Sequence, residues 1–148
     1  MKKQPTLRER ALRLLARREH SRAELARKLH AHAGSSDDLD PLLDELARRK
    51  LLSDERYAEA LANKLSRKYG TTRVAHELRA SGIGKELVLA ASKAAKETEF
   101  ERAREVWRRK FRVLPRTREE RAKHMRFLQS RGFSFDAIRI VVGGSLED

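Results

Sequence analysis

The chain has no cysteine, only three prolines and one tryptophan, and aromatic residues fill just 5% of its 148 positions. Without cysteine it can form neither disulfides nor thiolate zinc sites, which excludes disulfide-stapled secreted domains and zinc fingers. It also lacks any run of about 18 to 20 apolar residues, the length that a membrane-spanning helix needs. No hydrophobic signal segment is recognisable either. These absences predict a cytoplasmic protein with no membrane partner.

Charged and hydrophobic residues are equally frequent, at 39% each, and the formal net charge is +13. This balance leaves little apolar surface for one thick core and favours a thin, elongated arrangement of helices. The positive charge predicts a polyanion or an acidic protein surface as partner, because the summed potential steers such partners and favours phosphate contacts. The excess is greatest between Arg102 and Arg131, where 12 basic residues stand against three acidic ones. A solvated helix face without a partner is the alternative interpretation of this segment.

A repeat with a spacing of 50 residues relates the middle of the chain to its last third. The matching pairs are Tyr57 and Trp107, Leu61 and Phe111, Leu78 and Leu128, Gly82 and Gly132, Ile83 and Phe133, and Val88 and Ile138. The first third fits the same pattern with shifts of 49 or 50 residues. A period of this length indicates supersecondary units that bury their apolar faces against one another. We therefore predict an all-α fold, an elongated array of three tandem three-helix repeats with nine helices, over residues 1–51, 52–97 and 98–148.

Polar residues at regular positions predict where the helices begin and end. A Ser or Thr followed three residues later by Glu forms a capping box at a helix N-terminus. Such pairs are Thr6 with Glu9, Ser21 with Glu24, Thr98 with Glu101, and Thr117 with Glu120. In the second unit we expect helix starts at Ser53 and at Thr71–Thr72. Gly82 and Gly132 are expected to be left-handed C-caps, after which Ile83 and Phe133 pack back on their own unit.

The segment from Phe100 to Leu114 has the helical periodicity of an amphipathic helix. Its predicted apolar face holds Phe100, Ala103, Val106, Trp107, Phe111 and Leu114. This spacing predicts that Trp107 and Phe111 are core residues and not a stacking platform for bases. The opposite face holds Arg102, Arg104, Arg108, Arg109 and Arg112, of which some cover apolar surface with their stems and others are free to bind phosphate.

No motif in the chain indicates catalysis, a metal site or a cofactor site. The histidines form no His-Glu-x-x-His pair, and the segment Gly82-Ile83-Gly84-Lys85 lacks the first glycine and the Ser or Thr of a phosphate-binding loop. We predict no enzymatic activity, no catalytic residue, no metal and no cofactor.

Residues 21–29 also resemble the first helix of a helix-turn-helix DNA reader. The following helix would have to enter the major groove, but phosphates would repel its acids, which argues against this motif. These acids are Asp37, Asp38, Asp40, Asp44 and Glu45.

Four blocks of the sequence resemble, in order and spacing, those of the RecX family of bacterial RecA regulators. They are residues 10–21 with the pairs 24–25 and 28–29, residues 54–58, the stretch 69–83, and residues 127–133 with Ile138. The resemblance spans residues 7–142. It implies a non-enzymatic modulator, mainly an inhibitor, that binds in the groove of the filament of RecA recombinase on single-stranded DNA. Such a modulator blocks filament extension and suppresses the ATPase, strand-exchange and coprotease activities of RecA.

The basic residues of the second and third units are the predicted contact surface for RecA and DNA. They are Lys64, Arg67, Lys68, Arg73, Arg79, Arg108, Arg109, Arg112, Arg118, Arg121, Lys123, Arg126 and Arg131. Arg73 and Arg131 have a structural alternative, in which they pair with acids between units. We expect a monomer that contacts single- and double-stranded DNA electrostatically, without sequence specificity. A stand-alone helical DNA-binding protein and a purely structural helical adaptor are the other functional classes that the sequence leaves open.

Overall fold

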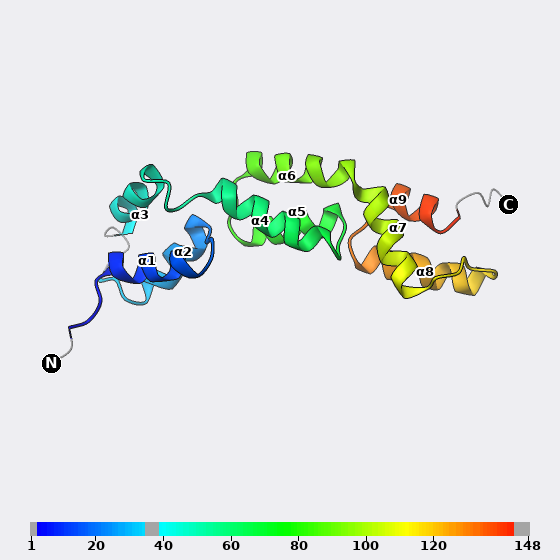
Figure 1. The fold of residues 1–148 in the computed structure, drawn as a ribbon, viewed down its shortest axis with the longest axis horizontal. Coiled ribbons are helices and arrows are strands. Elements are labelled where there is room, and N and C mark those ends of the chain that lie inside the picture. Colours follow the sequence, from blue (N-terminus) through cyan, green and yellow to red (C-terminus); the bar gives the residue numbers. More distant parts are fainter. Residues whose placement is uncertain (1–2, 35–38, 144–148) are drawn as a thin grey trace.

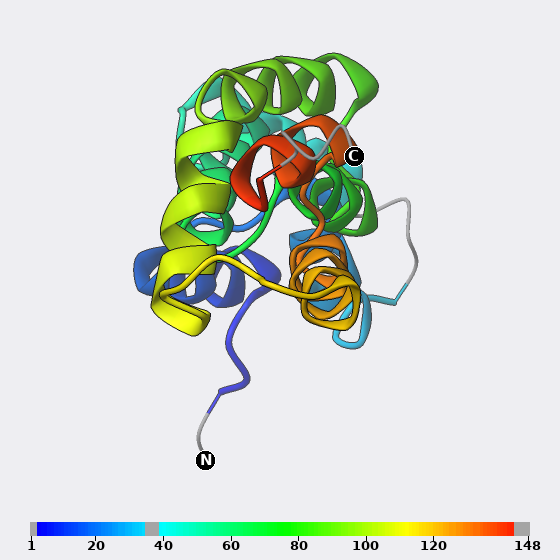
Figure 2. The same ribbon diagram turned by 90° about the vertical axis from the view of Figure 1, so that its right-hand side faces the viewer.

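The computed structural model describes residues 3–34 and 39–143, and within these ranges all regular structure is helical. The first repeat contains α1 (Leu7–Arg17), α2 (Arg22–His30) and α3 (Leu39–Arg48), the second α4 (Asp54–Ser66), α5 (Thr71–Ala80) and α6 (Lys85–Glu97), and the third α7 (Glu99–Lys110), α8 (Arg118–Ser130) and α9 (Phe135–Val141). The repeats follow one another along the long axis of the molecule (Figure 1) and overlap when the view is turned to look along that axis (Figure 2). This confirms the predicted all-α, elongated array of three-helix repeats. Asp37 and Asp38 of the helix-turn-helix argument lie outside the described residues.

Each repeat has a small apolar core of its own. Leu25, Leu29, Leu43 and Leu46 form the fully buried centre of the first repeat. The corresponding clusters lie around Leu78 in the second repeat and around Leu128 in the third. Because three thin cores need fewer apolar side chains than one thick core, a chain with 39% charged residues can fold in this way.

The 50-residue register is correct for the later helices of repeats two and three but wrong for their first helices. Ala11, Ala58 and Ala103 are all buried, and each is the fifth residue of its helix, so α4 and α7 correspond with a shift of 45 residues. By this count Trp107 corresponds to Ala62 and not to Tyr57. The shift rises to 50 because the connection from α7 to α8, residues 111–117, is longer than the connection from α4 to α5, residues 67–70, and because α8 has 13 residues where α5 has 10.

Side-chain caps begin four helices as predicted. The hydroxyl groups of Thr6, Ser21, Ser53 and Thr117 each accept a hydrogen bond, 3.1 Å long, from the backbone N–H three residues later. Ser134 caps α9 in the same way at 3.3 Å, although no Glu or Gln three residues later marks it as a capping box. The predicted starts therefore hold wherever the cap residue has the extended backbone that this bond requires.

The threonines at the starts of α7 and α5 do not cap these helices with their side chains. Thr98 is at once the last cap of α6 and the first cap of α7, with φ −110° and ψ 7°, so its hydroxyl donates backwards to Ala95 O at 3.4 Å. The predicted helix start at Thr71–Thr72 is confirmed, since α5 begins at Thr71, but Gly70 occupies the cap position and neither threonine caps the helix. The free N–H groups of α5 find other partners, across the boundary between repeats.

The glycines after α5 and α8 are left-handed C-caps, as predicted. Gly82 has φ +79° and Gly132 has φ +84°. The next residue then donates its N–H back to the helix, from Ile83 to Leu78 O at 3.1 Å and from Phe133 to Leu128 O at 3.2 Å. The side chains of Ile83 and Phe133 are buried in the cores of their own repeats.

The predicted apolar face of α7 is confirmed in its middle and wrong at its ends. Trp107 is buried, and Phe111 is half-buried with its ring stacked on His124 at 3.7 Å between centroids. By contrast, Phe100 and Leu114 are 39% and 53% exposed. Leu114 departs from the face because α7 ends at Lys110 and the chain then turns through a positive φ of 65° at Arg112.

The two joints between repeats share one construction. At each joint the first residue of a repeat's first helix is an acid that accepts a hydrogen bond from the first N–H of the preceding repeat's second helix. Arg22 N donates to Asp54 Oδ1 at 2.7 Å, and Thr71 N donates to Glu99 Oε1 at 3.2 Å. The left-handed glycine turns also pack there: a Cβ added to Gly82 or Gly132 would lie less than 3 Å from Ala23 or Arg73. The glycines are thus interface residues as well as caps.

Two side chains at the start of α7 hold four helix ends together. Glu99, which is 3% exposed, accepts from the backbone N–H of Thr71 and of Ser134 through the same oxygen, at 3.2 and 3.0 Å. One turn later, the Arg102 guanidinium donates to carbonyls at the ends of α4 and α6, namely Ser66 O, Tyr69 O and Ala95 O. Negative charge at helix N-termini and positive charge at C-termini complement the helix dipoles. The expectation that Arg102 belongs to an exposed basic face is therefore wrong, and its burial lowers its pKa.

Two buried histidines make stability depend on pH. Burial lowers the pKa of His20 and of His124, and Trp107 Nε1–H donates to an unprotonated His124 Nδ1 at 3.0 Å. Their contribution is complete above the unfolded pKa of about 6.5 and is lost as the pH falls through the lower folded values, because the unfolded chain then binds more protons. We expect a smaller free energy of unfolding in urea at pH 5.5 than at pH 7.5. His124→Gln, which keeps an acceptor for Trp107, should reduce the difference, and an undiminished difference in this variant would contradict the assignment to His124.

Candidate nucleic-acid interface

A basic groove lies where the second and third repeats meet. The turn after α4 forms one wall, and α7 and the end of α8 form the rest of a cavity of about 290 Å³. The lining residues are Arg67, Lys68, Val106, Arg109, Lys110, Phe127 and Arg131. Five of these seven side chains are cationic and none is acidic, so the groove is suited to an anion with apolar parts.

Two cations of this groove lie over aromatic rings. Lys110 Nζ lies 5.6 Å from the centroid of the Phe127 ring, and the Arg131 guanidinium lies 5.1 Å from the same ring. Arg131 also lies 5.6 Å from the ring of Tyr69. Because a cation above a ring remains accessible to anions, these contacts hold the positive groups in place without neutralising them.

Few of the predicted contact residues are neutralised by acids. Arg73 pairs with Glu77 at 3.1 Å, and Arg108 and Arg109 both pair with Glu105, at 2.9 and 3.3 Å. Hydrogen bonds from Arg108 hold the pKa of Glu105 below its ordinary value. In the described ranges the other ten predicted residues make no ion pair with a carboxylate. Their charges are available to a partner.

The structure brings four of the thirteen predicted residues together in the groove, namely Arg67, Lys68, Arg109 and Arg131. Arg73 has its backbone against Gly132 and its guanidinium 4.8 Å from the Tyr69 ring, so it also supports the joint. The remaining eight lie outside the groove: Lys64 on α4, Arg79 on α5, Arg108 on α7, Arg112 after α7, and Arg118, Arg121, Lys123 and Arg126 on α8. Of these, Arg121 is half-buried and the others are exposed.

Sequence reasoning missed basic residues in two places. Lys110 lines the groove described above, and its position four residues after Val106 on one helix face was a usable signal. A second basic groove, of about 300 Å³, lies in the first repeat between α1 and the end of α2. Its cationic residues are Arg10, Arg13, Arg17 and Lys28. The spacing of the three arginines, which places them on one face of α1, could have revealed it.

The described part of the chain offers no group of three or more His, Asp or Glu side chains that could hold a metal ion. None of its helices combines the length and the hydropathy needed to cross a membrane.

The acids of α3 that argued against a helix-turn-helix reader make ion pairs within the first repeat, from Asp44 to Arg22 at 2.8 Å and from Glu45 to Arg8 at 2.7 Å.

Comparison with protein families gives one consistent result along the chain. Residues 8–46, 53–91 and 97–142 match the models described as the first, second and third three-helix domains of RecX. The matches begin within a few residues of α1, α4 and α7.

Curated relatives named Regulatory protein RecX are similar over almost the whole chain. The protein of Leptothrix cholodnii is 45% identical over 94% of this chain and 88% of its own length, and that of Herminiimonas arsenicoxydans is 42% identical over 99% and 97%. Among solved structures, RecX from Lactobacillus salivarius superimposes with a TM-score of 0.81 over 93% of both chains at 19% identity. At that identity the likeness concerns the fold alone.

Proposed function

The chain belongs to the RecX family of regulatory proteins, and on that premise we propose that it is a modulator of the RecA recombinase, mainly an inhibitor. It binds in the groove of the RecA filament on single-stranded DNA, as a cytoplasmic monomer without enzymatic activity. Occupation of the filament blocks its extension and suppresses ATP hydrolysis, strand exchange and coprotease activity.

The observation that carries the proposal is the basic groove at the joint of repeats two and three. Its five cations and lack of acids match a phosphodiester backbone, and Phe127 offers apolar contact beside them. The unpaired cations of α8 lie on the helix that Arg131 follows directly. With the second basic groove in repeat one, positive charge occurs at both ends of an elongated molecule, which suits contact with several neighbouring protomers along a filament.

The decisive experiment adds the protein to preformed RecA filaments on single-stranded DNA and follows ATP hydrolysis. We expect inhibition at substoichiometric to equimolar protein, because an extended ligand occupies more than one protomer. Unchanged hydrolysis would reject the proposal. A stand-alone helical DNA-binding protein remains the alternative, since the same grooves suit free DNA. It would bind DNA equally well with and without RecA and leave the ATPase unaffected at low DNA coverage.

Charge removal in the groove tests its contact with DNA. We expect the double substitution Arg67→Ala with Lys68→Ala to weaken binding to single-stranded DNA about tenfold and to flatten its salt dependence. Each lost phosphate contact removes about 0.7 from the slope of log K against log salt concentration. Fluorescence anisotropy at several salt concentrations measures both quantities. Lys93→Ala with Lys96→Ala, which removes two exposed charges of α6 outside the groove, is the matched control. Equal losses in the two double variants would mean that only net charge matters.

A further inference from the structure

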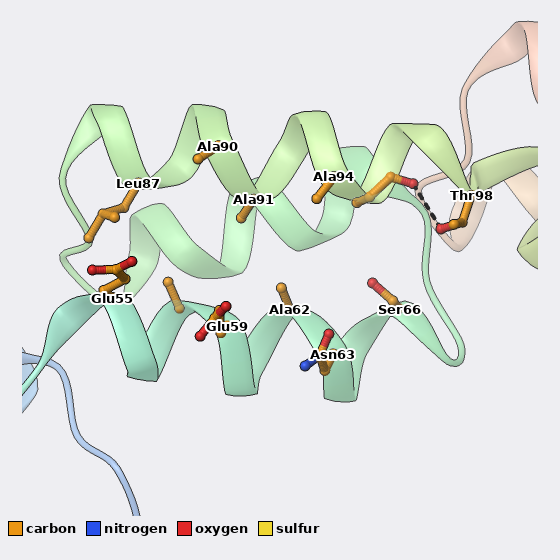
Figure 3. Close-up of a pocket in the computed structure, with 12 residues that line it drawn as sticks. Glu55, Glu59, Ala62, Asn63, Ser66, Leu87, Ala90, Ala91, Ala94 and Thr98 are labelled. Atoms are coloured by element: carbon orange, nitrogen blue, oxygen red, sulfur yellow. Dashed lines mark hydrogen bonds between the residues drawn. The ribbon is translucent and has the colours of Figure 1, made fainter.

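A second surface, opposite in chemistry to the basic grooves, lies between α4 and α6 of the middle repeat. It is a cavity of about 440 Å³, open to solvent and bordered by two rows of side chains (Figure 3). The row on α4 is Glu55, Ala58, Glu59, Ala62, Asn63 and Ser66. The row along α6 and its C-cap is Leu87, Ala90, Ala91, Ala94, Ala95 and Thr98. Six of the twelve residues are alanine, and none is basic. We call this surface the alanine groove.

The groove has the form of a seat for a helix. In both rows the residues recur at i, i+3, i+4, i+7, i+8 and i+11, so each row is one straight stripe along its helix. Eleven residues of helix extend about 16 Å, or three turns. Ala58 and Ala95 form a buried floor, while Ala90 and Ala94 are exposed at the rim. A partner helix of about three turns could place side chains at its own i, i+3, i+4 and i+7 positions against this surface.

Small side chains on α4 leave the groove of the middle repeat open. The ninth residue of each repeat's first helix is Leu15 in α1, Ala62 in α4 and Trp107 in α7. Leu15 packs against the core of the first repeat, and Trp107 is buried in that of the third. At Ala62 the corresponding space is empty and open. Stability would favour filling it, since larger apolar side chains bury more surface.

Charge identifies the class of partner. In the described part of the chain neither Glu55 nor Glu59 makes an ion pair, and both are exposed at one end of the groove. Two free acids in a protein with net charge +13 leave this surface unfavourable for DNA, whose phosphates they repel. A helix that carries Lys or Arg beside apolar side chains meets both requirements, because its cations pair with the acids while its stems cover the alanines.

We propose that the alanine groove is a docking site for a cationic amphipathic helix of a RecA protomer. This inference rests on the proposed function, which supplies the partner, and divides the surface between two tasks. The basic grooves hold DNA, and the alanine groove holds protein. Contact with both components at once explains how a regulator can prefer the assembled filament to free DNA.

Charge reversal tests the site with the whole protein. Glu55→Lys with Glu59→Lys should weaken binding to RecA filaments about tenfold, the usual effect of losing anchoring contacts in an interface. The same variant should bind free single-stranded DNA at least as well as the wild type, since its net charge rises. Glu86→Lys with Glu101→Lys, on exposed acids outside the groove, makes the same change of net charge and should keep filament affinity. Equal filament affinity in the two double variants would overturn the proposal.

Cross-linking identifies the occupant directly. A photoreactive phenylalanine in place of Ala94 should cross-link to a RecA peptide that contains Lys or Arg, whereas the same residue in place of Ala60, exposed on α4 but outside the groove, should not. Cross-links from position 94 to DNA or to a second copy of this chain would overturn the proposal. If the wild type inhibits RecA but both tests are negative, the groove proposal alone fails. If the wild type leaves the ATPase unchanged, the proposed function fails and the RecA assignment fails with it.

Discussion

Glu99→Ala is expected to lower the free energy of unfolding by about 3–5 kcal/mol, the largest effect of any single substitution considered. The Glu99 side chain is 3% exposed, and its Oε1 accepts from the backbone N–H of Thr71 and of Ser134. Removal of the acceptor leaves two N–H groups without a partner at the starts of α5 and α9, and a hydrogen bond to a charged group contributes about 1.5–3 kcal/mol. Urea unfolding followed by circular dichroism measures the loss.

Two further variants separate the causes of that loss. Glu99→Gln keeps a side-chain oxygen at the same place and should lose less than Glu99→Ala, because only the charge at the two helix N-termini is removed. Glu101→Ala, on the same first turn but exposed, should stay within about 1 kcal/mol of the wild type. If Glu99→Ala were no worse than Glu101→Ala, Glu99 would not hold the joint.

Gly70→Ala is expected to open the joint between repeats two and three. A Cβ at this position would lie less than 3 Å from Gly132 O and from the backbone of Phe133, none of which can rotate away. The two repeats must therefore separate, which breaks the bonds from Gly70 N to Arg131 O at 2.8 Å and from Thr72 N to Gly132 O at 3.2 Å. Overpacking of this kind costs about 1–3 kcal/mol and sometimes more.

Gly70→Ala should also impair DNA binding, and this second effect distinguishes a displaced third repeat from a purely local defect at residue 70. Arg131 lines the basic groove opposite Arg67 and Lys68, so a displaced third repeat moves the cations apart. We expect a lower midpoint of urea unfolding together with weaker binding of single-stranded DNA in anisotropy measurements at low denaturant. Gly34→Ala is the control, because a Cβ there meets nothing within 4 Å, and it should change stability by less than about 0.5 kcal/mol. Wild-type behaviour of Gly70→Ala in both assays would contradict the described joint.

Local features of the sequence predicted most of the fold. Ser21 and Thr117 cap helices through N–H groups three residues away, and Gly82 and Gly132 end helices through their own backbone angles. Such bonds depend on neighbours in the chain and are therefore visible as short patterns. The prediction failed at Thr98, where two helices meet without the extended residue that a cap needs. It failed again in the register of α7, because both the connections between the first and second helices and the second helices themselves differ in length.

The candidate site was only partly predictable. Composition indicated that the third repeat is rich in cations, and Arg109 and Arg131 do line the basic groove. The predicted basic face of α7, the helix of Arg109, also held Arg102, which was not among the predicted contact residues and has a different role. Arg102 is half-buried and donates to carbonyls that lie 33 and 36 residues earlier in the chain. Whether an arginine is available to phosphate depends on what packs above it.

By itself the sequence determined the helical class, the three repeats, the helix ends that are capped locally and the family, since all of these depend on short-range pattern and on order along the chain. Only the tertiary structure decided how the repeats are joined. Glu99 reaches N–H groups 28 and 35 residues away, and Gly70 meets Gly132 through contacts between repeats. The basic groove and the alanine groove likewise arise only where two helices lie side by side. Such surfaces depend on how closely helices from different parts of the chain pack, and short sequence patterns do not contain these distances.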